Sequence, residues 1–249
     1  MLAKRAFFSF LELTDRSRHQ EFNEYHQLDH RPENLALPGV VWGERWVRSP
    51  DCAALSSGGD AELGRINYVA MYWFRDPVEE SVAEWVELGD LAFQWGRRPE
   101  TDWARREVGF FRPLKGYVNP RVLVSPDALP FRPVRGMHIS ILEVPEPRSS
   151  AAEAAFRWYD RTHIPDLVAC PGVAGAWTFS RNQTGSGQPG LRVHLLFLDE
   201  DPLEVLAGID QRRKEWAAEG RMHDLDGVIE ERLSTPLRTI TPWQWDWFD

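Results

Sequence analysis

One stretch of this chain occurs twice, and this repeat constrains the fold more than any other feature of the sequence. His30 matches His163, Pro32 matches Pro165, and the turn Pro38-Gly39-Val40 matches Pro171-Gly172-Val173, all at one offset of 133 residues. A chance motif would not keep a constant offset without a gap. The sequence therefore predicts two copies of one structural unit.

Each copy predicts an amphipathic helix that ends where the motif reads His-x-Pro. In the first copy the helix covers residues 18–30, and in the second it covers residues 151–162. Proline lacks a backbone N–H and restricts the residue before it, so we expect both helices to stop there. The short turn that follows then leads into a strand.

The remaining elements repeat in the same order. The first half predicts strands at 5–13, 40–48 and 66–74, a helix opened by Asp76-Pro77, and a fourth strand within 112–118 or 121–124. The second half predicts strands at 136–144, 174–180 and 191–198, a helix over 201–219, and a last strand within 228–240. By composition, residues 49–64 and 182–190 are flexible connections.

These elements divide the chain into two repeats. The first repeat is predicted to span residues 1–124 and the second residues 135–249, joined by a proline-rich linker over 125–134. The chain ends in a segment with three tryptophans, which we expect to dock as an aromatic tail because exposed tryptophans are a liability. Each half has the order β-α-β-β-α-β, which is the ferredoxin-like α+β motif with an antiparallel sheet.

Two predicted strands are apolar on both faces. Residues 68–74 and 193–198 have almost no polar alternation, so both faces of each sheet should be covered. Helices cover one face, and the economical cover for the other is the sheet of the second repeat.

A ferredoxin-like unit with His-x-Pro-Asp/Glu followed by Pro-Gly-Val resembles the dimeric α+β barrel superfamily, particularly its EthD-like branch. The matching residues are His30 to Glu33 in the first half and His163 to Asp166 in the second. The resemblance implies tandem repeats that pack sheet to sheet as a barrel within one chain, with a pocket between sheet and helices. It also implies an activity among cofactor-free oxygenases, lactone isomerases, polyketide cyclases and haem-using enzymes, or a protein without one.

Composition narrows the class of partner. The chain has 249 residues and a net charge of −9, which argues against nucleic acid as a partner. The two cysteines form no disulfide framework, and the N-terminus has no long apolar segment, so we expect a cytoplasmic protein without a membrane span.

The two copies differ at positions that matter for chemistry. Aligning the first strands pairs Phe7 with His138, and aligning the third strands by their Asp-Pro turns pairs Val69 with His194. Histidine on a central strand needs a hydrogen-bond partner or a function, and it is the natural acid or base near neutral pH. We therefore expect a pocket in the second copy with four catalytic candidates: His138, His163, His194 and Tyr159.

Further residues are candidates for binding a substrate. They are Trp158, Asp166, Trp177 and Phe197 in the second copy, and His26 and His30 in the first. Structural alternatives stand beside each assignment. His30 and His163 are also suited to capping a helix C-terminus, and the repetition favours that role. His138 and His194 could be satisfied core histidines, and Asp166 could pair with an arginine. No metal-ligand spacing such as HxxxH is present, so we expect no metal.

These observations favour a cofactor-independent enzyme that performs acid/base chemistry on a small hydrophobic aromatic or polyketide-like molecule. The reaction would be a cyclisation, dehydration, isomerisation or cofactor-free monooxygenation. Two alternatives remain open, a non-catalytic binding protein and a haem enzyme of the same superfamily. Association into a homo-oligomer beyond the fused pseudo-dimer is a further expectation.

Overall fold

The structure is a computed structural model that describes residues 2–99, 102–182 and 189–248. The chain divides into two compact units. The first contains Met1–Asp51, Ala61–Pro113 and Thr239–Asp249, and the second contains Cys52–Asp60 and Leu114–Arg238. The proline-rich segment 125–134 lies inside the second unit, where it forms a short 3-10 turn with Leu129 fully buried.

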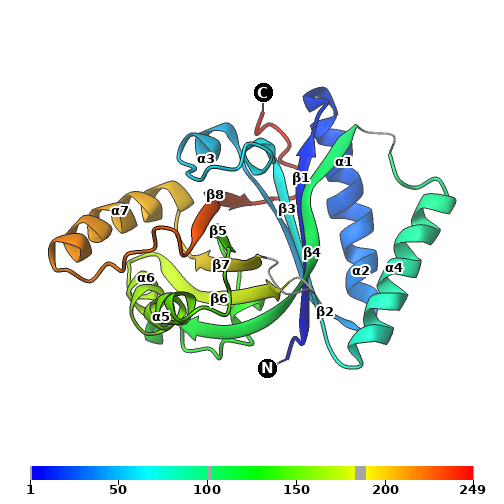
Figure 1. Cartoon of the computed structure of the whole chain (residues 1–249). Coiled ribbons are helices and arrows are strands. Elements are labelled where there is room, and N and C mark those ends of the chain that lie inside the picture. The colour runs from blue at the N-terminus through cyan, green and yellow to red at the C-terminus, as the bar shows by residue number, and fades with distance from the viewer. Residues whose placement is uncertain (1, 100–101, 183–188, 249) are drawn as a thin grey trace. The chain divides into compact units, whose positions relative to one another are not determined.

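The sheet of the first unit is antiparallel and has the order β2-β3-β1-β4. Its strands are β1 (Arg5–Leu13), β2 (Val40–Val47), β3 (Tyr68–Phe74) and β4 (Trp103–Val118). Helices α1 (His19–Glu24), α2 (Arg31–Ala36) and α4 (Val78–Gln94) lie along one face of this sheet (Figure 1).

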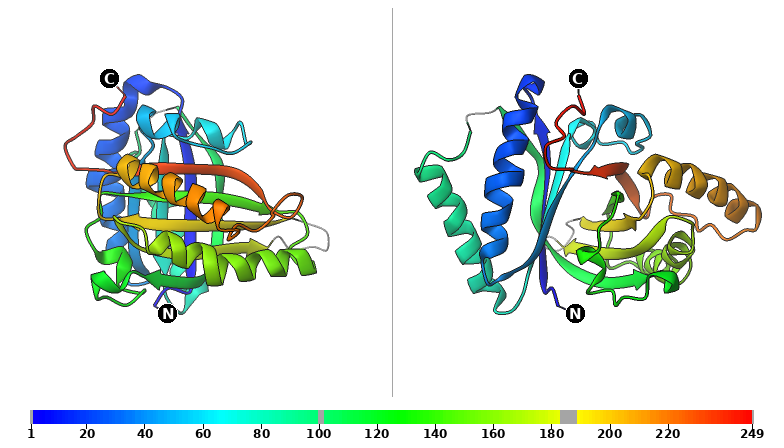
Figure 2. Two further views of the ribbon diagram at one scale, coloured as in Figure 1. Left: turned by 90° about the vertical axis from the view of Figure 1, so that its left-hand side faces the viewer. Right: turned by 180° about the vertical axis from the view of Figure 1, so that it is seen from behind.

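The second unit repeats this arrangement with the strand order β6-β7-β5-β8. Its strands are β5 (Gly136–Val144), β6 (Val173–Asn182), β7 (Gly190–Leu198) and β8 (Glu230–Thr239). Helices α5 (Ser150–Trp158), α6 (Ile164–Val168) and α7 (Pro202–Ala218) cover one face, as the left view of Figure 2 shows for α5 and α7. In the loop predicted over 182–190, residues 183–188 lie outside the described residues.

Each unit has a core between its helices and its sheet. In the first unit Phe7 packs against Trp85 of α4, with ring centroids 4.8 Å apart. In the second unit Val205 and Ile209 of α7 pack on Leu196 and Leu198 of β7. These contacts bury the apolar stripe of each helix, which is what holds helices on a sheet.

The prediction that both first helices stop before the proline is wrong. In each copy the helix continues through the motif by way of a π-helical segment, Tyr25–His30 in the first unit and Tyr159–His163 in the second. At the end of these segments the N–H of Arg31 bonds to the oxygen of His26, and that of Ile164 to the oxygen of Tyr159. Proline then occupies the first turn of α2 and α6, next to the change of hydrogen-bond register, so its missing N–H does not end the helix.

Two other local predictions need correction. Residues 49–64 are not simply a flexible connection, because Pro50–Ala54 forms helix α3 and Cys52 is fully buried. Strand β4 begins at Trp103, well before the predicted start, because its backbone pairs with that of β1 from Trp103 to Phe111.

The aromatic C-terminal tail docks as expected. Trp245, Trp247 and Phe248 pack against the first unit's cluster around Phe22 and Tyr68, and the ring of Phe248 stacks on His19 at 3.9 Å. Trp243 is the exception, with 74% of its surface exposed.

The predicted class, a mixed α+β fold with antiparallel strands, is confirmed. The packing of two repeats into one barrel stays a prediction.

Within the described residues no helix is both long and apolar enough to cross a membrane. Cys52 and Cys170 are free thiols and both are buried.

Candidate functional site

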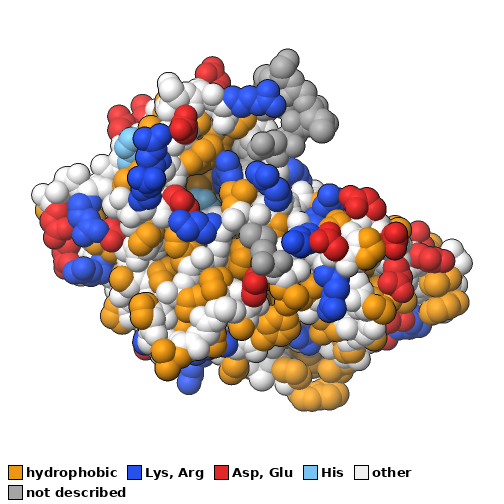
Figure 3. Space-filling model, turned by 90° about the horizontal axis from the view of Figure 1, so that it is seen from below, with side chains coloured by type: hydrophobic (Ala, Val, Ile, Leu, Met, Phe, Trp, Pro, Cys, Tyr) orange, Lys and Arg blue, Asp and Glu red, His pale blue; other side chains and the backbone are white. Residues whose placement is uncertain are grey.

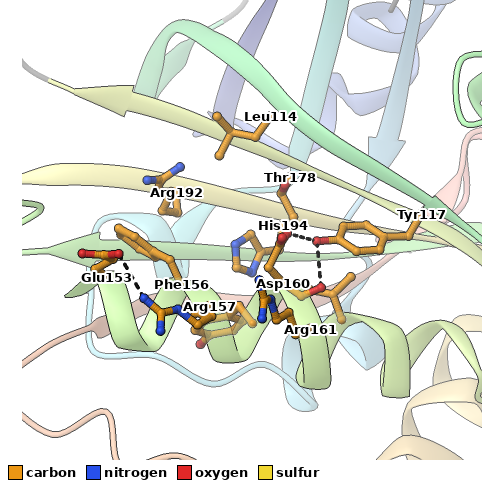
Figure 4. Close-up of a pocket in the computed structure, with 12 residues that line it drawn as sticks. Leu114, Tyr117, Glu153, Phe156, Arg157, Asp160, Arg161, Thr178, Arg192 and His194 are labelled. Atoms are coloured by element: carbon orange, nitrogen blue, oxygen red, sulfur yellow. Dashed lines mark hydrogen bonds and ion pairs between the residues drawn. The ribbon is translucent and has the colours of Figure 1, made fainter. Parts of the chain in front are cut away.

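The second unit contains a cavity of about 330 Å³ between its sheet and helix α5. This volume is at the lower end of the range of about 300–1,000 Å³ that is typical of small-molecule sites, and it suits a molecule of about one or two rings. Figure 3 shows a hollow in which pale blue histidine atoms lie below a rim of arginine or lysine side chains. The lining residues all belong to the second unit and come from β4, α5, the π-helical segment, the start of α6, β6 and β7 (Figure 4).

Two aromatic rings form the inner wall of this cavity. His194 projects from β7, and Tyr159 projects from the start of the π-helical segment; their ring centroids are 4.9 Å apart in an edge-to-face contact. Neither side chain forms a hydrogen bond within the described part of the chain. Most buried polar groups in native proteins have a hydrogen-bond partner. Two such groups without one, both facing a cavity, are therefore candidates for hydrogen bonds to a ligand.

A second, much smaller cavity of about 40 Å³ shares His194 and Tyr159 with the first. It is also lined by His138 on β5 and His163 at the end of the π-helical segment. The Nε2 atom of His138 lies 2.9 Å from the hydroxyl of Ser234 on β8, so His138 is a hydrogen-bonded core histidine that also reaches this space. The volume is enough for about one water molecule.

Burial sets the protonation state of these groups. It lowers the pKa of His138, His163 and His194 to about 3 each, with smaller contributions from nearby arginine or histidine charges. Burial also raises the pKa of Tyr159 above its ordinary value, and Glu231 adds to this effect. At neutral pH the site therefore holds neutral imidazoles, which accept protons, beside a protonated phenol, which donates a hydrogen bond.

Charged side chains form the outer part of the larger cavity. The Asp160 carboxylate accepts hydrogen bonds from the Tyr117 hydroxyl and, at 2.9 Å, from the Lys115 ammonium (Figure 4 labels Tyr117 and Asp160). Although burial acts to raise the pKa of Asp160, these two hydrogen bonds lower it below its ordinary value. The guanidinium of Arg192 lies over the ring of Phe156, 4.1 Å from its centroid.

The sequence did not indicate this outer part. Tyr117 and Asp160 are 43 residues apart, and no local pattern joins them. Arg192 precedes His194 by two positions on β7, so the alternation of a strand places both on one face. That spacing was the one signal that could have identified Arg192.

The register of the strands corrects the alignment of the two copies. Ser140 is opposite His194 in the second unit, and the equivalent Ser9 is opposite Ala70 in the first. The counterpart of His194 is therefore Ala70, not Val69. The turn before the second helix is one residue longer in the second copy, so matching the two Asp-Pro pairs displaced the alignment by one position.

The same register shows what fills the equivalent space of the first unit. Thr178 is opposite His194, and the equivalent residue opposite Ala70 is Arg45. The guanidinium of Arg45 lies 5.3 Å from the Phe22 ring centroid and 5.2 Å from that of Tyr68, and the residue is 2% exposed. At the repeat offset, Phe22 corresponds to Ala155. A large side chain fills the first unit where small ones leave space in the second.

The other predicted binding residues lie away from the cavity lining. The Trp158 ring stacks on His163 with centroids 4.6 Å apart, and the Asp166 carboxylate pairs with Arg221 at 2.5 Å. Trp177 and Phe197 are buried on the opposite face of the sheet from their neighbours Ala176 and Leu196, which face the helices. Trp177 donates its indole N–H to the oxygen of Pro126 at 2.9 Å.

His26 and His30 belong to the first unit and lie apart from the second unit's cavity lining. The ring N–H of His26 donates to the oxygen of Phe22 at 2.8 Å, one turn back along its own helix. The Nδ1 atom of His30 is buried and has no hydrogen-bond partner in the part of the chain that the structure describes. His30 is not the helix C-terminal cap that the sequence allowed, and neither is His163, because the helix continues past each of them.

Comparison with solved structures gives the fold. A putative chlorite dismutase matches with a TM-score of 0.57 and 13% identity, over 97% of this chain and 96% of the other. A putative monooxygenase from Fusobacterium nucleatum matches with a TM-score of 0.54 and 6% identity, over 97% and 94%. A DypB variant from Rhodococcus jostii RHA1, in complex with haem, matches with a TM-score of 0.56 and 9% identity, over 97% and 94%.

These likenesses, at 6–13% identity, concern the fold alone. They leave the EthD-like branch and the activity open. No family model matches the sequence, and no curated protein matches it.

One of these neighbours is bound to haem, which raises the question of whether the cavities of the second unit could hold that group. Haem needs a flat slot with an axial ligand such as histidine facing the iron. The space beside His138 and His163 is only about 40 Å³, which is far too small for a porphyrin. In the larger cavity of about 330 Å³, the Arg192–Phe156 stack and the Tyr117–Asp160 pair line the same space as His194. The second unit's residues, as arranged, do not fit haem. Among the described residues no group of three or more His, Cys, Asp or Glu side chains is placed to hold a metal ion.

Proposed function

We propose that the cavity of the second unit is the active site of a cofactor-independent enzyme that moves a proton on a small aromatic or polyketide-like molecule. The observation that carries this proposal is the pair His194 and Tyr159. Both side chains line the cavity and neither has a hydrogen-bond partner among the described residues. Convergent, unpartnered polar groups in a mainly apolar cavity are characteristic of a substrate site.

The two groups suit complementary roles. His194 is neutral at neutral pH, so it can accept a proton from the carbon beside a substrate carbonyl. Tyr159 is protonated, so it can donate a hydrogen bond to the carbonyl oxygen, which receives the electron pair of the broken C–H bond as an enolate. Return of the proton to another atom gives an isomer. Attack of the enolate carbon on a second carbonyl gives a ring, and loss of hydroxide gives a dehydrated product.

The smaller cavity supports this assignment. A water in its volume of about 40 Å³ would lie among His138, His163 and His194. It would receive the proton from His194 and return it, while the hydrogen bond from His138 to Ser234 keeps that ring fixed. We assign His163 and His138 to this positioning role and not to contact with the substrate.

The proposal can be tested without knowing the substrate. In D₂O, 1-tetralone offers an aromatic ring fused to a cyclic ketone with an exchangeable C–H beside the carbonyl, and proton NMR follows the loss of that signal. The enzyme should accelerate exchange above the buffer rate, and His194→Ala and Tyr159→Phe should each reduce the acceleration at least tenfold. His26→Phe removes the polar ring at the equivalent position of the first unit and should have no effect.

If the protein bound 1-tetralone saturably but did not accelerate its exchange, the proposed enzymatic function would be wrong, and the result would favour a non-catalytic binding protein. The haem alternative has its own measurement, a titration of the purified protein with haem followed in the Soret region. A stoichiometric complex whose band is lost in His194→Ala or His163→Ala would overturn the proposed cofactor-free chemistry.

We further infer that the chain is a tandem fusion of two ferredoxin-like repeats of the EthD-like branch. The shared strand order, the two π-helical segments and the constant sequence offset support this inference. The fusion frees one copy to fill its interior while the other keeps a cavity.

A further inference from the structure

The larger cavity carries more positive than negative charge, in a chain whose net charge is −9. Three arginines line it, Arg157, Arg161 and Arg192, against two carboxylates, Glu153 and Asp160. This excess is local to the cavity and runs against the sign of the whole molecule.

The two carboxylates are already engaged by neighbouring cations. Glu153 pairs with Arg157 at 3.0 Å, and Asp160 pairs with Lys115 at 2.9 Å. Arg161 makes no hydrogen bond or ion pair with any residue in the described ranges. An incoming ligand therefore meets the Arg161 guanidinium on the helix side of the cavity, where both acids of the lining already have cationic partners.

A second cation stands on the strand side. Arg192 and His194 are two positions apart on one face of β7, which separates their Cα atoms by about 7 Å. The guanidinium of Arg192 is held over the Phe156 ring, so its orientation is defined. The strand therefore places a cation and the His194 imidazole on the same side of the cavity.

We propose that the substrate is an aromatic carboxylate, with its carboxylate bound between Arg192 and Arg161 and its ring directed along Phe156 toward His194 and Tyr159. Planar guanidinium groups pair with carboxylates in two parallel hydrogen bonds, and they also stack on aromatic rings. The proposal deepens the proposed function and rests on it, because it takes the same cavity as the substrate site. It differs from the sequence-based expectation of a purely hydrophobic substrate.

The test compares two probes that differ only in charge, 2-naphthoate and the neutral 2-naphthamide, by isothermal titration calorimetry. We expect 2-naphthoate to bind at least tenfold more tightly at low ionic strength. Arg192→Gln and Arg161→Gln should each weaken the binding of 2-naphthoate at least fivefold and leave that of 2-naphthamide unchanged. Arg192→Lys should retain part of the affinity, which separates loss of charge from loss of fold.

Arg16→Gln removes the same charge from an exposed site of the first unit and is the matched control. Equal affinity for the two probes, or naphthoate binding that neither cavity variant changes, would overturn the inference. Its failure is distinguishable from failure of the proposed function. Charge-selective binding without proton exchange on 1-tetralone would contradict the proposed enzymatic function but would support the carboxylate-binding site. Proton exchange without charge-selective binding would support the enzymatic function and would contradict the carboxylate-binding site.

Discussion

The two units have the same strand order and the same π-helical interruption, yet the second unit has a cavity where the first is filled. In the first, the Arg45 side chain lies against Phe22 and Tyr68 and occupies the space opposite Ala70. In the second, Thr178 stands at the equivalent position opposite His194, and the cavity opens there. The comparison teaches that the fold does not decide where a site lies. A few changes of side-chain volume on a shared backbone do.

The units also differ in how they place polar groups. The first buries polar atoms that have no hydrogen-bond partner among the described residues, including Nη2 of Arg45 and Nδ1 of His30. Burial lowers the pKa of Arg45 to about 10, because its charge is kept from water. The second turns its unpaired groups, His194 and Tyr159, toward a space that a ligand can enter. In the second unit, a bound ligand can therefore supply the hydrogen-bond partners that His194 and Tyr159 lack.

The largest effect should follow from emptying the filled unit. Arg45→Ala removes a buried side chain and leaves a cavity, so we expect the free energy of unfolding to fall by about 3 kcal/mol. Arg45→Met keeps most of the volume without the unpaired charge, and its cost should stay below about 1 kcal/mol. Urea denaturation at pH 7 measures both. If the two variants were equally unstable, charge and not volume would be the role of Arg45.

The reciprocal change should close the open unit. Thr178→Arg places in the second unit the side chain that fills the first, and we expect at least a 100-fold loss of affinity for 2-naphthoate. That loss corresponds to about 2.7 kcal/mol. Calorimetry measures the affinity, and a circular dichroism melt checks that the fold is kept. Unchanged binding in a folded Thr178→Arg protein would place the ligand elsewhere.

His138→Phe makes the second unit match Phe7 of the first. The pKa of His138 is about 3 in the folded protein against an ordinary value of 6.5, so the unfolded chain binds its proton more readily. The stability from this group is fully present above pH 6.5 and is lost as the pH falls toward 3. Its removal should flatten the dependence of the free energy of unfolding on pH by up to about 1.4 kcal/mol per pH unit in that window. Urea titrations at pH 4, 5 and 7 measure the slope, and Phe7→His should make it steeper.

The smallest effect concerns the pH dependence of proton exchange. A histidine base of ordinary pKa would give a transition near pH 6.5, but burial lowers the pKa of His194 to about 3. The exchange rate on 1-tetralone, corrected for buffer, should therefore change less than about twofold between pH 5 and 8. A clear transition near pH 6.5 would show that His194 is more accessible to water than its surroundings indicate.

Much of the fold could be predicted from the sequence, because the repeat and the apolar runs are local signals. The predicted strands at 5–13 and 136–144 agree with β1 and β5, and the helix predicted over 201–219 agrees closely with α7. The passage of each first helix through its proline could not be predicted. A shift to π-helical hydrogen bonds leaves the pattern of residue types unchanged, so the proline pointed to an end that does not occur.

The candidate site could be predicted only in part. The four predicted catalytic candidates, His138, His163, His194 and Tyr159, all line the smaller cavity. Trp177 and Phe197 lie on the other face of the sheet, because the sequence showed strands apolar on both sides and gave no way to tell the faces apart. The pair of Tyr117 with Asp160 joins segments far apart in sequence, so only the folded chain shows it.

The most direct test of the difference between the units is a histidine NMR spectrum recorded with and without 2-naphthoate, using protein labelled with ¹⁵N at histidine. Assignments come from single His→Gln variants. Our account predicts that the signals of His194 and His163 move with the ligand, while those of His26 and His30 stay in place. Movement confined to His26 or His30 would contradict it, because the first unit would then hold the site.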